Sequence, residues 1–144
     1  MKNSQLIDLL QHFNAEELQE LQLLVASPFF NRGNFTEETL ALMNFIAEAA
    51  PGFAEADLKR ANAYRAVFQD ATPVEGKLDK VMSELHKLAR EFVSVSRYMQ
   101  PENEFRRHLD QAAFYRTHGL DQRYQNLIQK LEARQKDVTR LDQD

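Results

Sequence analysis

The sequence has no cysteine among its 144 residues. This absence excludes disulfide bonds, thiolate metal ligands and cysteine nucleophiles, and it suits a reducing compartment. Glycine and proline are also scarce, with four of each, so long stretches can form uninterrupted helix. No apolar run approaches the roughly 18 residues that would cross a membrane. We therefore expect a cytoplasmic chain that does not enter a membrane and that folds on a hydrophobic core alone.

Negative charge is in small excess, with a net charge of −4, and the charges are unevenly distributed along the chain. Residues 1–56 contain eight acids and two bases, which gives −6, whereas residues 57–99 contain eight bases and six acids, which gives +2. An acidic surface repels phosphates. The first third of the chain therefore disfavours nucleic acid as a partner.

What the sequence does contain is helical periodicity. We expect about seven helices and no strand, with helices near 4–12, 14–27, 36–50, 55–69, 75–97, 101–118 and from 121 onward. Asn14 and Glu17 have the spacing of a capping box, and Thr36 is expected to cap the third helix. Apolar residues repeat most regularly in 75–97, which predicts a central helix with Leu85 fully buried.

These elements predict an all-α fold, a compact single-domain array that ends in a helical hairpin. We expect one domain over 1–134 and a polar C-terminal helix end over 135–144 that frays or projects. Residues 105–131 also resemble a tetratricopeptide-type hairpin, although an ordinary antiparallel helix pair explains them better.

The connector between the second and third helices carries two adjacent phenylalanines, Phe29 and Phe30, among Pro, Asn and Gly. Large apolar side chains are usually buried, so we expect both rings to pin the connector to the core, although they could instead form an exposed docking patch.

Three segments together resemble an uncharacterised family of bacterial all-helical proteins. They are the connector motif Leu-x-x-Ser-Pro-Phe-Phe-Asn at 24–31, the Ala-Val-Phe run at 66–68, and the apolar helix of 78–92. The resemblance covers roughly residues 6–130 and implies a helical domain without established chemistry. Members of the family often continue into further helical hairpins, which leaves open whether the chain is a piece of a longer protein.

No catalytic, cofactor or metal motif is recognisable, so we expect no enzyme activity, no cofactor and no metal site. Glu104 and His108 are i,i+4 neighbours, which indicates a surface ion pair far more readily than a metal site.

Nucleic-acid binding of helix-turn-helix type is the alternative function. Its residues would be Lys77, Lys80, Lys87 and Arg90 on the polar face of the fifth helix. Acids on the same face and a long preceding loop favour a core helix instead. Bases interleaved with aromatics near 97–124 are better explained as an ordinary solvated face.

The last helix offers the predicted partner surface. Its apolar positions follow the 4–3 spacing of a coiled-coil seam, formed by Leu127, Leu131, Arg134, Val138 and Leu141. The sequence thus predicts a non-enzymatic protein-interaction or scaffold module that binds a protein partner or associates weakly with itself.

Overall fold

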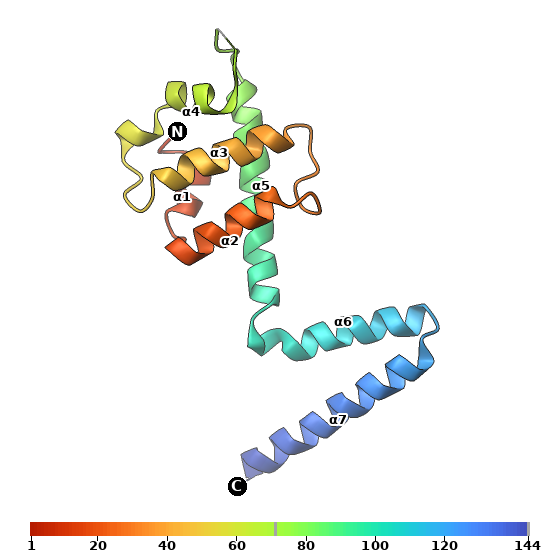
Figure 1. Ribbon diagram of the computed structural model, residues 1–144. Coiled ribbons are helices and arrows are strands. Elements are labelled where there is room, and N and C mark those ends of the chain that lie inside the picture. The colour runs from red at the N-terminus through yellow and green to blue at the C-terminus, as the bar shows by residue number, and fades with distance from the viewer. Residues whose placement is uncertain (71, 144) are drawn as a thin grey trace. The chain divides into compact units, whose positions relative to one another are not determined.

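The computed structural model describes the backbone of residues 1–70 and 72–143, and the side chains of residues 1–70 and 72–137. Within these residues it contains seven α-helices and no strand (Figure 1). The helices are α1 (Gln5–Leu10), α2 (Ala15–Ala26), α3 (Thr36–Glu48), α4 (Arg60–Val67), α5 (Lys77–Tyr98), α6 (Glu104–Thr117) and α7 (Asp121–Gln143). Two 3-10 helices, η1 (Glu55–Leu58) and η2 (Pro101–Asn103), precede α4 and α6. The predicted all-α class, with seven helices and a C-terminal hairpin, is confirmed.

The contacts within the chain divide it into two compact units, residues 1–93 and residues 94–144. The first unit contains α1 to α4 and most of α5. The second contains the end of α5 and the α6–α7 hairpin. The predicted boundary between a domain over 1–134 and a polar end over 135–144 stays a prediction.

The hydrophobic core of the first unit is built on α5. This helix alone contributes seven buried side chains: Leu78, Val81, Met82, Leu85, Leu88, Ala89 and Phe92. They join buried residues of α1 to α4 in one cluster, and Figure 1 shows those helices beside the first part of α5. Leu85 is 0% exposed, which confirms its predicted burial. Phe13 belongs to the short segment between α1 and α2, and its ring centroid lies 5.5 Å from that of Phe92.

The start of α2 is the capping box that the sequence predicts. The Asn14 side chain accepts a hydrogen bond from the Glu17 N–H at 2.8 Å, and the Glu17 carboxylate accepts one from the Asn14 N–H at 3.0 Å. The expected cap on α3 is wrong. Thr36 is the first helical residue, and Phe35 occupies the N-cap position without a side-chain hydrogen bond.

The connector between α2 and α3 is held by Asn31. Its side-chain amide donates to the carbonyl oxygens of Val25 at 2.9 Å and Thr36 at 3.0 Å, which ties the end of one helix to the start of the next. The expected burial of both phenylalanines is wrong for one of them. Phe30 packs against the core, whereas Phe29 is 70% exposed.

The predicted helix over 55–69 is divided into η1 and α4. Lys59 lies between them with an extended backbone, φ −69° and ψ 135°, and this conformation interrupts the helix. Tyr64 of α4 makes two hydrogen bonds to residues that precede α5. Its hydroxyl donates to the Asp70 carboxylate at 2.7 Å and accepts from the Val74 N–H at 3.0 Å. Lys77 donates to the same Asp70 carboxylate oxygen at 2.6 Å.

Candidate functional site: the C-terminal hairpin

The hairpin of α6 and α7 follows from two sequence signals at its turns. Pro101 begins η2 just before α6, where a missing N–H does not matter. Gly119 follows α6 in the left-handed region, with φ +69°, a conformation that glycine adopts readily at helix ends, and the helix predicted near 101–118 ends there. The Leu120 N–H then bonds the Tyr115 carbonyl oxygen at 2.8 Å, and α7 begins at Asp121.

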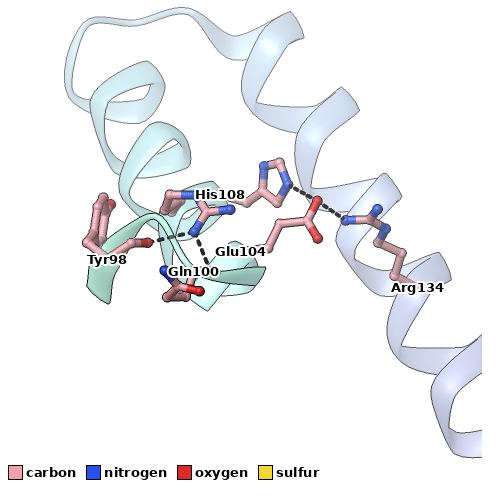
Figure 2. Close-up of polar contacts among 6 residues, drawn as sticks. Tyr98, Gln100, Glu104, His108 and Arg134 are labelled. Atoms are coloured by element: carbon pink, nitrogen blue, oxygen red, sulfur yellow. Dashed lines mark hydrogen bonds and ion pairs between the residues drawn. The ribbon is translucent and has the colours of Figure 1, made fainter. Parts of the chain in front are cut away.

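A polar cluster at the start of α6 joins the two helices of the hairpin, as Figure 2 shows. One Glu104 carboxylate oxygen accepts from the Arg134 guanidinium of α7 at 2.9 Å and lies 3.4 Å from Nε2 of His108. The Arg134 hydrogen bond, and then that of His108, holds the pKa of Glu104 below its usual value of 4.5. The predicted Glu104–His108 pair is therefore present, and its third member comes from 30 residues along the chain.

His108 contributes only one of its ring nitrogens to this cluster. Nδ1 is buried and has no hydrogen-bond partner among the described residues. A buried polar atom without a partner costs free energy, so Nδ1 adds nothing to the stability that the Glu104 contact gives.

The same unit also fixes the residues that lead into α6. The Arg107 guanidinium donates to the carbonyl oxygens of Tyr98 at 2.6 Å and Gln100 at 2.8 Å (Figure 2). The Tyr98 hydroxyl donates to Asp110, and this hydrogen bond raises the pKa of Tyr98 above its usual value of 10.0. Together these bonds fasten the last turn of α5 to the first half of α6.

A groove of about 380 Å³ lies along the hairpin beside this cluster. It is lined by Glu104, His108, Leu127, Lys130, Leu131, Ala133 and Arg134. Two leucines of α7 supply apolar surface, and the charged groups of Glu104, Lys130 and Arg134 stand among them. Such a lining suits an apolar or amphipathic side chain of a partner.

The second unit leaves several of its large apolar side chains exposed. Among the described residues of this unit, only Ala112 and Leu131 are buried hydrophobic residues. Its exposed ones are Tyr98, Met99, Phe105, Leu109, Phe114 and Leu120. Their spacing does not distinguish these positions from core positions, because periodicity identifies a helix face without showing whether anything covers it.

The five residues of the predicted seam of α7 do not share one environment. Leu131 is 6% exposed and Leu127 is half-buried, so both belong to the interior of the hairpin itself. Arg134 reaches back to Glu104 and remains largely exposed. The side chains of Val138 and Leu141 lie outside the described residues. The role of these five positions in binding a partner stays a prediction.

The residues of the nucleic-acid alternative lie on α5. Lys77 is engaged by the Asp70 carboxylate, and its Nζ lies 4.5 Å from the centroid of the Phe68 ring. Lys80, Lys87 and Arg90 are exposed. At least one of the four predicted phosphate contacts, Lys77, is thus already engaged within the chain, which weakens this alternative.

Comparison of the chain with protein-family models, with curated proteins and with solved structures gave no match. The resemblance to a bacterial helical family therefore stays a prediction. Within residues 1–70 and 72–137, no group of three or more His, Asp or Glu side chains is placed to hold a metal ion. Among the described helices, none combines the length and the apolar character needed to cross a lipid bilayer.

Proposed function

We propose that the chain is a non-enzymatic protein-interaction or scaffold module and that its C-terminal hairpin is the contact element. One observation carries this proposal: α6, α7 and the turn between them expose four large apolar side chains, Phe105, Leu109, Phe114 and Leu120, whereas Ala112 and Leu131 are the buried hydrophobic residues among their described positions. A pair of helices can bury only the stripe that faces its partner helix, so the remaining apolar surface favours a further helix or protein surface. A cytoplasmic, bacterial setting is part of the proposal, supported by the absence of cysteine and the family resemblance.

The partner can be a different protein or a second copy of the chain. The seam spacing of Leu127, Leu131, Arg134, Val138 and Leu141 continues beyond Arg134, and this continuation supports self-association. The association is expected to be weak, because Leu127 and Leu131 already pack within the hairpin and a seam of fewer than three heptads binds only modestly. Light scattering of the full chain and of a chain ending at Ala133 separates the two cases. Self-association predicts an average mass that rises with concentration in the full chain and rises less in the shortened one.

Identical monomeric masses at high concentration would contradict self-association and leave a different protein as the partner. A photo-reactive benzophenone side chain at position 109, in place of Leu109 and introduced in the native cell, tests whether a different protein binds the hairpin. We expect discrete cross-linked species from Leu109 and none from Gln125, an exposed polar position of α7. If both positions give no product and the mass stays monomeric, the hairpin is not a contact element.

A further inference from the structure

The two most exposed large hydrophobic side chains among the described residues lie six positions apart in the first unit. They are Leu23, which is 73% exposed, and Phe29, which is 70% exposed. Single exposed apolar residues are common on protein surfaces. Two such residues at the end of one helix are a different case, because partner surfaces usually centre on a few large apolar side chains.

The exposed surface of α2 continues from these residues toward the helix start. Glu16, Glu20 and Leu23 are separated by four and three positions, so they share one face of the helix. All three are exposed. Phe29 follows the C-terminal end of the same helix. We call Glu16, Glu20, Leu23 and Phe29 the α2 docking surface.

Phe29 is held in place, although it is exposed. Its N–H bonds the Ser27 hydroxyl at 3.3 Å, and its ring meets Phe30 edge-on with 5.2 Å between the centroids. Phe30 in turn packs against the core, and Asn31 ties the connector to both neighbouring helices. A rigid exposed ring loses little conformational entropy when a partner covers it, which makes it a good anchor.

The charges on the two helices around this surface have one sign, and the connector adds one base, Arg32, beside Phe29. α2 and α3, which are linked by a Gln22–Asn44 hydrogen bond of 3.1 Å, together contain six acids and no base. The C-terminal end of α2, beside Phe29, also carries the negative end of the helix dipole. The Phe29 ring already attracts a cation, because the Arg32 guanidinium lies 4.9 Å from its centroid.

From these observations we infer that the α2 docking surface binds a basic amphipathic helix of a partner protein. Apolar side chains of that helix contact Leu23 and Phe29, and its lysines or arginines face Glu16 and Glu20. Charge complementarity selects a basic partner, since an acidic helix would meet like charges at Glu16 and Glu20. This inference is independent of the hairpin, which lies in the other unit.

The test uses the full chain and a dye-labelled 14-residue peptide of leucine and lysine with helical apolar spacing. A twin peptide with glutamate in place of lysine is the comparison, and fluorescence anisotropy gives both affinities. We expect the lysine peptide to bind about tenfold more tightly than its twin at low salt, with a difference that narrows as salt increases.

Two variants locate the binding. Leu23→Ser and Phe29→Ser should each weaken binding of the lysine peptide about fivefold, which is the usual effect of truncating an apolar anchor. Both positions are exposed, so the thermal melt should stay close to that of the wild type. The hairpin variant Leu109→Ser should leave this affinity unchanged, which separates the α2 docking surface from the hairpin.

A charge-matched pair of variants separates a specific surface from net charge. Glu16→Gln/Glu20→Gln and Glu37→Gln/Glu48→Gln remove the same charge from exposed positions of α2 and α3. The inference requires the first pair to weaken binding and the second to leave it within about twofold. Equal losses from both pairs, equal affinity for the two peptides, or unchanged affinity of Leu23→Ser and Phe29→Ser would overturn it.

Discussion

At the scale of single residues, burial separates positions that look alike in the sequence. Leu85 and Leu23 are both leucines on helices that mix apolar and charged residues, yet Leu85 is 0% exposed and Leu23 is 73% exposed. We expect Leu85→Ala to lower the free energy of unfolding by about 2–5 kcal/mol, because it removes buried methyl groups and leaves a cavity. Leu23→Ala should change it by less than about 0.5 kcal/mol. Urea unfolding followed by circular dichroism measures both, and equal effects would mean that α5 is not the centre of the core.

The ion pair of Asp70 and Lys77 gives the first unit a pH dependence. The hydrogen bond from Lys77, and then that from Tyr64, lowers the pKa of Asp70 below its usual value of 3.8. The hydrogen bond to Asp70 raises the pKa of Lys77 above its usual value of 10.5. The contribution of Asp70 is therefore present above about pH 3.8 and is lost as pH falls through its lowered pKa. That of Lys77 is present below about pH 10.5 and is lost as pH rises through its raised pKa.

Asp70→Asn tests this pair without removing the hydrogen-bonding group. We expect the variant to melt a few degrees below the wild type between about pH 5 and 9, and the gap to close as pH falls through the lowered pKa of Asp70. Asp57→Asn, an exposed carboxylate of η1, removes the same charge and is the control. A gap that is independent of pH, or one that Asp57→Asn reproduces, would show that the Lys77 interaction does not stabilise the fold.

At the scale of elements, the two helix starts that resemble each other in sequence behave differently. Asn14 caps α2 in a reciprocal capping box, whereas Thr36 makes no cap and begins α3 itself. We expect Asn14→Ala to cost about 1 kcal/mol of unfolding free energy, and Thr36→Ala to cost clearly less. Chemical denaturation of the two variants decides this, and a loss at Thr36 as large as that at Asn14 would place a cap on α3 after all.

Local signals explain why these elements could be predicted so well. The capping box at Asn14, the end of α2 at Ser27 just before Pro28, Gly119 after α6 and the regular apolar face of α5 each depend on residues within a few positions of one another. The surroundings of a side chain depend on the whole fold. Phe29 and Phe30 are adjacent in sequence, yet only Phe30 reaches the core. The contact between Glu104 and Arg134 crosses 30 residues, and no local pattern predicts it.

The candidate site could also be predicted only in part from local sequence patterns. Periodicity predicts α6, α7 and their hairpin, and it places Leu131 on a seam that is assigned to a partner, whereas Leu131 is buried within the hairpin. It could not predict that Phe105 and Leu109 would be exposed, since an uncovered face and a buried face have the same spacing. The acidic composition of α2 was readable in the sequence, but its combination with an exposed Leu23 and Phe29 required the structure.

At the scale of the whole molecule, the two units differ in how many buried hydrophobic residues they contain. Every member of the main buried cluster lies between Leu6 and Phe92, within the first unit. The second unit has two buried hydrophobic residues among its described positions, Ala112 and Leu131. Apolar burial is the main favourable term in folding, so the stability of the chain must be concentrated in residues 1–93.

This difference predicts the behaviour of the separated parts. A chain ending at Tyr98, which keeps α5 whole, should be helical and melt cooperatively, because it retains the entire cluster. A peptide of residues 94–144 should show weak helicity and a broad, non-cooperative melt, because two helices with little buried surface are marginal in water. Circular dichroism of both pieces gives the answer. A cooperative melt of the 94–144 peptide would make the hairpin self-sufficient and remove the reason for it to bind a partner. A marginal hairpin would instead gain order when a partner covers Phe105 and Leu109, which links its low stability to the proposed function.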